Sequence, residues 1–217
     1  MKILVLTDDY WHPGEVVERG LAFLQDEFEL DFVRDAKDIL YPELLDRYPL
    51  IINAKMNEIS CANRTPWFDH LPEVQVKDFE AYVRSGHGFL GLHAGNSYFW
   101  DKEDENPYCR FIGCAFVRHP DRCDIEVRPE GTHPITDGAV PFRIHDEHYE
   151  IDHLLPDAQV ILRSTSETGG TQVAGYVHTL GEGRMCSLIP GHVLSVFDDP
   201  TYRTILRRAI RWCVKEL

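Results

Sequence analysis

Short apolar runs alternate with amphipathic stretches through the first half of the chain. The apolar runs, each of a length typical of a buried strand, are residues 2–7, 30–33, 50–53 and 89–92. Between them, apolar residues recur at helical spacing in residues 15–27, 41–47 and 74–84. Because strands that alternate with helices favour right-handed crossovers, this half of the chain predicts a doubly wound, mainly parallel sheet.

The pattern changes after residue 106, where strand-like runs follow one another without long helices between them. These runs are residues 115–117, 124–128, 142–147, 160–164, 172–178 and 185–189. Gly181 and Gly183 separate the last two runs, which is a hairpin signature, and residues 201–214 predict a closing amphipathic helix. The two halves together predict one α/β domain over residues 1–217, with an antiparallel or mixed extension of the sheet.

The most informative stretch is Gly91-Leu92-His93-Ala94-Gly95, at the end of the apolar run over residues 89–92. Small residues around one reactive side chain, directly after a strand, are typical of a nucleophile elbow. Such a turn presents its central side chain beside backbone N–H groups that can bind an anion or an oxyanion. The usual occupant is Ser or Cys, but here it is His93, whose imidazole suits a general base, a proton shuttle or a metal ligand. The alternative is that His93 is a packed histidine held by hydrogen bonds and has no functional role.

A second group of polar and aromatic residues, Asp8-Asp9-Tyr10-Trp11-His12-Pro13, follows the first apolar run. Ligands of parallel sheets collect at the carboxyl ends of the strands, so Trp11 and His12 are candidates for binding a sugar by stacking and polar contacts. An ordinary helix-entry loop, with Asp9 as the capping residue, explains the same sequence equally well.

A third group is His145-Asp146-Glu147-His148-Tyr149-Glu150, in which acidic residues lie among histidines. Alternation along a strand places Glu147 and Tyr149 on one face and Asp146 on the other. Either face could supply an acid–base carboxylate or metal ligands, and Glu147 is the preferred member. The alternative for any one of these side chains is that it is simply exposed to solvent and has no role in catalysis or metal binding.

Further candidate histidines follow a strand or precede a proline. His192, in Pro190-Gly191-His192, lies just past the apolar run over residues 185–189. His119 and His133 each precede a proline, which holds the histidine in an extended conformation. We interpret His133 as structural, whereas His119 is open to either role.

The chain contains eleven histidines, which makes a divalent metal such as zinc an alternative. The spacings HxH, HxxxH and HExxH do not occur, so the ligands would have to come from distant loops. The sequence therefore leaves the cofactor open.

Charge and composition exclude several classes of partner. The formal net charge of −14 argues against a nucleic-acid or anionic-membrane partner. No apolar run approaches the roughly 20 residues that span a bilayer, and the N-terminal run is too short for a secretory signal. Six cysteines without a CxxC pair fit free thiols in the cytoplasm. A homo-oligomer is compatible with the sequence, because apolar positions serve an interface as well as a core.

The chain resembles the ThuA-like family, which is associated with trehalose utilisation and has a fold similar to class I glutamine amidotransferases. The resemblance covers nearly the whole chain. It rests on Gly-Leu-His93-Ala-Gly, His119-Pro120, His133-Pro-Ile-Thr136-Asp-Gly138, Asp146-Glu147-x-Tyr149, and Gly181-x-Gly183-Arg184 leading to Pro190-Gly191-His192. It implies a flavodoxin-like, three-layer α/β/α sandwich and a pocket built on His93. It also implies a sugar substrate, since family members are thought to act on oxidised (keto) disaccharides or related sugars.

Our leading hypothesis is a carbohydrate-active enzyme in which His93, Glu147 and His192 are catalytic. The expected substrate-binding residues are Trp11, His12, Asn96, Tyr98, His119 and Asp146. Isomerisation or cleavage of a 3-keto-sugar fits these groups, because proton abstraction next to a carbonyl needs a base and an oxyanion site. Thiol-based glutamine hydrolysis is not expected, because the elbow carries His93 in place of a cysteine. The alternatives are a non-catalytic sugar-binding or regulatory domain and a metal-dependent hydrolase.

Overall fold

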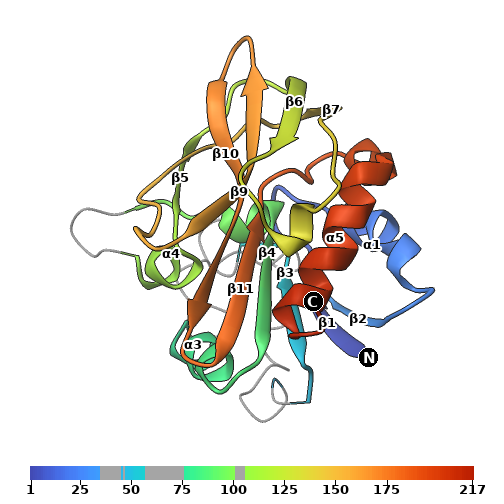
Figure 1. Ribbon diagram of the computed structural model, residues 1–217, viewed down its shortest axis with the longest axis vertical. Helices are drawn as coiled ribbons and strands as arrows, with labels where there is room; N and C mark the ends of the chain where they lie inside the picture. Colours follow the sequence, from blue (N-terminus) through green and yellow to red (C-terminus); the bar gives the residue numbers. More distant parts are fainter. Residues whose placement is uncertain (35–44, 46, 57–75, 101–105) are drawn as a thin grey trace.

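A nine-stranded sheet runs through the centre of the computed structural model, which describes residues 1–34, 45, 47–56, 76–100 and 106–217 (Figure 1). The parallel half of the sheet has the order β2 (Glu29–Val33), β1 (Lys2–Leu6), β3 (Leu50–Asn53), β4 (Gly88–Leu92) and β11 (Gly183–Leu188). This is the strand order of flavodoxin-like sheets, so the predicted fold class is confirmed.

The second half of the sheet is antiparallel, as the change of pattern after residue 106 predicts. Its strands are β10 (Gly170–Leu180), β9 (Gln159–Ser166), β6 (Cys123–Pro129) and β7 (Phe142–Asp146). The predicted hairpin joins β10 to β11, with Leu180 opposite Gly183. The short strands β5 (Ala115–Arg118) and β8 (Glu150–Asp152) pair with each other in a separate sheet.

Helices cover both faces of the parallel half (Figure 1). One face packs against α1 (Gly14–Gly20) and α5 (Pro200–Cys213), and the other against α3 (Val76–Arg84) and α4 (Pro107–Ile112). Successive residues of β1 alternate between the two cores: Ile3 and Val5 contact the first, and Leu4 and Leu6 the second. The inner parallel strands are therefore apolar on both sides, which is why they appear in the sequence as continuous apolar runs, whereas the edge strand β2 carries Glu29 and Asp31. None of the described helices is long and apolar enough to cross a membrane.

The helix predicted over residues 15–27 is shorter than expected. It ends at Gly20, and a 3-10 turn, η1 (Ala22–Leu24), follows. Gly20 packs so closely on Phe197, in the turn η5 (Leu194–Asp198), that a Cβ atom there would lie 2.5 Å from the ring. The helix predicted over residues 41–47 lies largely outside the described residues.

A nucleophile elbow ordinarily leads into an α-helix, but the elbow after β4 leads into a single 3-10 turn, η3 (His93–Asn96). The chain leaves the helical path at Ser97 and pairs with β5, since Phe116 donates its backbone N–H to the Tyr98 carbonyl. A fourth 3-10 turn, η4 (Pro134–Thr136), is capped by the side chain of His133. This contact agrees with the structural interpretation of His133.

Candidate active site

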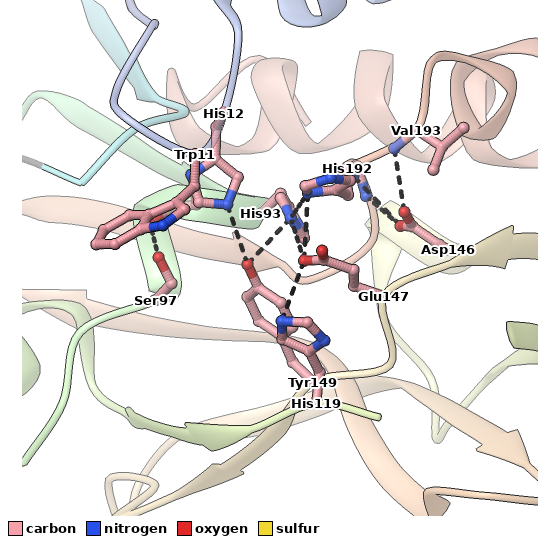
Figure 2. Close-up of polar contacts among 12 residues, drawn as sticks. Trp11, His12, His93, Ser97, His119, Asp146, Glu147, Tyr149, His192 and Val193 are labelled. Atoms are coloured by element: carbon pink, nitrogen blue, oxygen red, sulfur yellow. Dashed lines mark hydrogen bonds and ion pairs between the residues drawn. The ribbon is translucent and has the colours of Figure 1, made fainter. Parts of the chain in front are cut away.

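Three strand ends and the segment after β7 bring four side chains together at one edge of the sheet (Figure 2). His12 follows β1, His93 follows β4, His192 follows β11, and Glu147 follows β7. One nitrogen or oxygen atom from each of the four lies within 4.8 Å of the others. The cluster contains the predicted catalytic residues and one predicted substrate-binding residue, His12.

The elbow holds His93 in a strained backbone conformation, with φ 43°, at the centre of this group. The turn is pressed against β3, because a Cβ atom on Gly95 would lie 2.0 Å from the Asn53 carbonyl oxygen. The buried His93 ring has its Nδ1 2.9 Å from the Ile189 carbonyl oxygen. Since a carbonyl only accepts, Nδ1 carries a proton and Nε2 faces the cluster.

Asp9 holds His12 in a comparable way. Its Oδ1 accepts backbone N–H bonds from Trp11 and His12, and the His12 Nδ1 lies 2.8 Å from the same oxygen. The expected capping role of Asp9 is wrong, because α1 begins at Gly14, whose backbone N–H donates to Asp8 Oδ1. Asp9 instead orients the His12 imidazole. Burial lowers the pKa of His12, and the hydrogen bond that the ring donates to Asp9 offsets this only in part, so the site favours a neutral ring.

Glu147 links the histidines from the opposite side. Its Oε2 lies 3.2 Å from His192 Nδ1, 3.5 Å from His93 Nε2 and 3.6 Å from His119 Nε2. Burial alone would raise the pKa of Glu147, but hydrogen bonds with His192 and His93 outweigh it and hold that pKa well below its ordinary value. Burial opposes a charge on His93 too, yet its bond to Glu147 raises the pKa of the imidazole. The cluster therefore favours a carboxylate beside a positive charge.

Asp146 lies directly behind the cluster and is completely buried. Its Oδ2 accepts the backbone N–H bonds of Gly191 and His192, at 2.7 and 3.4 Å, and its Oδ1 accepts that of Val193 at 3.1 Å. Because both oxygens are used inside the protein, Asp146 positions the loop that carries His192. The sequence led us to expect that Asp146 contacts the substrate, but in the structure it supports the loop that carries His192.

A cavity of about 380 Å³ opens in front of the cluster, within the range of small-molecule sites. The residues that line it include His12, His119, Glu147, Tyr149 and His192, with Trp11, Phe99 and Phe116 as aromatic walls. Three of the predicted substrate-binding residues, Trp11, His12 and His119, are thus in contact with the cavity.

Two other predicted substrate-binding residues do not reach the cavity. Tyr98 is 1% exposed and stacks on Tyr108 in the core, with ring centroids 3.9 Å apart. Asn96 is fully buried beneath the elbow and donates to the Leu188 carbonyl. The chain is extended after the 3-10 turn, so the neighbouring side chain, Phe99, lines the cavity in place of Tyr98.

Tyr149 was not among the site residues expected from the sequence. Its hydroxyl lies 3.0 Å from His93 Nε2 and 3.5 Å from His12 Nε2. Burial, together with the charges of Glu147 and Asp146, raises the pKa of Tyr149, so the phenol keeps its proton. The signal for it was the alternation that placed Tyr149 on the face of Glu147. Phe99 and Phe116, the aromatic walls, had no comparable signal.

Comparison with known proteins identifies the family. The family model for ThuA, described as trehalose utilisation, matches residues 2–213. The chain belongs to the ThuA family. The search of curated proteins found no match.

Several solved structures share the fold of this ThuA-family protein. A ThuA-like protein from Bacteroides uniformis is 21% identical, with a TM-score of 0.73 over 98% of this chain and 91% of that chain. A cytoplasmic protein from Salmonella typhimurium LT2 is 16% identical, with a TM-score of 0.72 over 98% and 99%. A glutamine amidotransferase from Thermotoga maritima is 14% identical, with a TM-score of 0.62 over 99% and 98%. The resemblance to the amidotransferase fold is thus confirmed at the level of architecture.

Proposed function

We propose that this ThuA-family protein is a carbohydrate-processing enzyme that acts on a keto-sugar by moving a proton at the carbon next to the carbonyl. The observation that carries the proposal is the composition of the cavity. Its floor includes His12, His192 and Glu147, which are the members of the cluster that line it, and its walls are aromatic rings.

The aromatic walls support a sugar as the ligand. Trp11 is 50% exposed and Phe99 is 59% exposed, although large apolar side chains are normally buried. Exposed apolar surface beside a polar pocket is typical of a binding site. A pyranose has apolar C–H faces that stack on such rings and hydroxyl groups that bind the polar floor.

The floor supports enolate chemistry. When the proton leaves the carbon, the C–H electron pair forms a C=C bond and the carbonyl oxygen becomes negative. The positive charge that Glu147 favours on His93 would stabilise this oxygen. If an oxygen substituent lies on the next carbon, its C–O bond breaks and it takes up a proton. If that C–O bond stays intact, the hydroxyl proton on the deprotonated carbon moves to the former carbonyl oxygen and the abstracted proton is delivered to the former carbonyl carbon. The carbonyl group has then moved to the adjacent carbon, and the sugar is isomerised.

We assign His119 to accept the proton. Its Nδ1 lies 2.8 Å from the Pro120 carbonyl oxygen and therefore carries a proton, which leaves Nε2 as the basic atom. His119 lines the cavity and remains partly exposed, in reach of a bound sugar. Glutamine hydrolysis is not part of the proposal, because no described cysteine lines the cavity and the elbow presents an imidazole.

The proposal is tested by following the 3-keto form of trehalose with the wild-type protein and with Glu147→Gln. Loss of the carboxylate removes the group that orients three imidazoles, so we expect turnover to fall by about 100-fold or more. Glu126→Gln is the matched control, because Glu126 pairs with arginines on the surface and its loss should leave turnover unchanged. Calorimetric binding of the keto-sugar without any product would instead show a sugar-binding protein.

A further inference from the structure

The four clustered side chains direct nitrogen and oxygen atoms that can act as ligands at one point. His12 and His93 each use Nδ1 elsewhere, so in the neutral imidazoles the Nε2 atoms are directed at the cluster as acceptors, together with the carboxylate of Glu147. Converging acceptors repel one another unless a proton or a metal cation lies between them. We propose that His12, His93, Glu147 and His192 bind one divalent transition-metal ion, for which zinc is the first candidate.

The distances fit such an ion. A metal with nitrogen and oxygen ligands at about 2.0 Å holds neighbouring ligand atoms about 3.3 Å apart in a tetrahedron. Three separations in the cluster match this value. His93 Nε2 is 3.2 Å from His192 Nδ1, His192 Nδ1 is 3.2 Å from Glu147 Oε2, and His93 Nε2 is 3.5 Å from the same oxygen. The His12 atom lies within 4.8 Å of these three and closes the fourth corner.

The residues behind the cluster are those that metal-binding histidines require. A ligating histidine almost always donates its other N–H to a carboxylate or a backbone carbonyl, which fixes the tautomer. His12 has the carboxylate of Asp9, and His93 has the carbonyl of Ile189. The loop that carries His192 is held by three backbone hydrogen bonds to Asp146. A charged pair formed by His93 and Glu147 alone would not require His12 beside it, nor the Asp9 carboxylate that orients His12.

The donor set also indicates the class of metal. Three imidazoles and one carboxylate suit zinc, manganese, iron, cobalt or nickel, whereas magnesium and calcium prefer all-oxygen sites. The geometry alone supports the binding of a metal ion, whereas the role of that ion in catalysis rests on the proposed function. The ion would replace the proton on His93 as the positive charge beside the carbonyl oxygen. His119 and Tyr149, which lie outside the ligand set, stay available for proton transfer.

The site is tested by calorimetric titration of Zn²⁺ and Mn²⁺ into full-length protein that carries no histidine tag and has been dialysed against a chelator. We expect one equivalent of Zn²⁺ to bind to the wild type. His93→Ala and His192→Ala should each weaken binding by about 100-fold or more, and Asp9→Asn by about 10–100-fold. His145→Ala is the control, because His145 pairs with Asp124 on the surface and its loss should leave one equivalent bound.

A second measurement guards against variants that fail to fold. Zn²⁺ should raise the melting temperature of the wild type and of His145→Ala, and should leave that of a folded His192→Ala unchanged. Co²⁺ should give the intense visible absorption of a four-coordinate site only in proteins with an intact set. Absence of stoichiometric binding in the wild type, or equal binding by His192→Ala, would overturn the proposal. Neither result depends on sugar turnover, so failure of this site is distinguishable from failure of the proposed function.

Discussion

At the scale of single residues, the chemistry of this site depends on supporting groups as much as on the residues that face the cavity. Asp9 and Asp146 share this property: each carboxylate is buried and each is used up by hydrogen bonds inside the protein. The sequence marks both as polar residues near strand ends, but it cannot show which way a carboxylate turns. Asp146 and Glu147 are neighbours in the chain, yet one supports the loop and the other faces the cavity.

Asp146→Asn tests the supporting role. The amide keeps one acceptor but loses the charge and places an NH₂ group against backbone N–H donors, so we expect the free energy of unfolding to fall by about 1–3 kcal/mol. Chemical denaturation measures this change. The control is Asp124→Asn, an exposed partner of His145, for which we expect a change within about 0.5 kcal/mol. Equal effects of the two substitutions would show that Asp146 does not hold the loop.

At the scale of elements, the inner parallel strands were predictable because each contacts a core on both sides and is largely apolar. The limits of the first helix were not predictable, because they depend on Gly20 meeting Phe197, which is distant in the sequence. The elbow was recognised from its glycines, but its continuation as a 3-10 turn depends on pairing between the Tyr98 segment and β5. That pairing also explains why Phe99, and not Tyr98, faces the cavity.

Gly95→Ala tests the close packing of the elbow on β3. Its Cβ atom would lie 2.0 Å from the Asn53 carbonyl oxygen, and backbone on both sides would have to move. We expect a loss of more than about 3 kcal/mol of unfolding free energy, as for severe overpacking. Gly170→Ala is the comparison, because it has open space around it and a φ of 63°, so only a conformational cost of about 1–2 kcal/mol should appear. A Gly95→Ala protein as stable as Gly170→Ala would contradict the packing argument.

At the scale of the whole molecule, the site exists because the flavodoxin-like strand order brings distant segments to one edge. β1, β4 and β11 are parallel, so His12, His93 and His192 are delivered to the same side, and the antiparallel extension returns Glu147 to face them. The sequence indicated His12, His93 and His192 from their places after apolar runs, and Glu147 from the group of acidic residues and histidines that contains it. Their convergence could not be read from spacing, because no two of the four are close in the chain. The ThuA family and the fold are established, and the chemistry is our proposal.

The measurement that tests this proposal most directly is hydrogen exchange in D₂O. The wild-type protein is incubated with the 3-keto form of trehalose, and deuterium is followed by NMR at the carbon next to the carbonyl, in both recovered sugar and product. We predict incorporation well above the rate in buffer, and a rate at least about 100-fold lower with Glu147→Gln. If the hydrogen at this carbon exchanges no faster than in buffer while the protein is saturated with the keto-sugar, proton transfer is not the function of the protein.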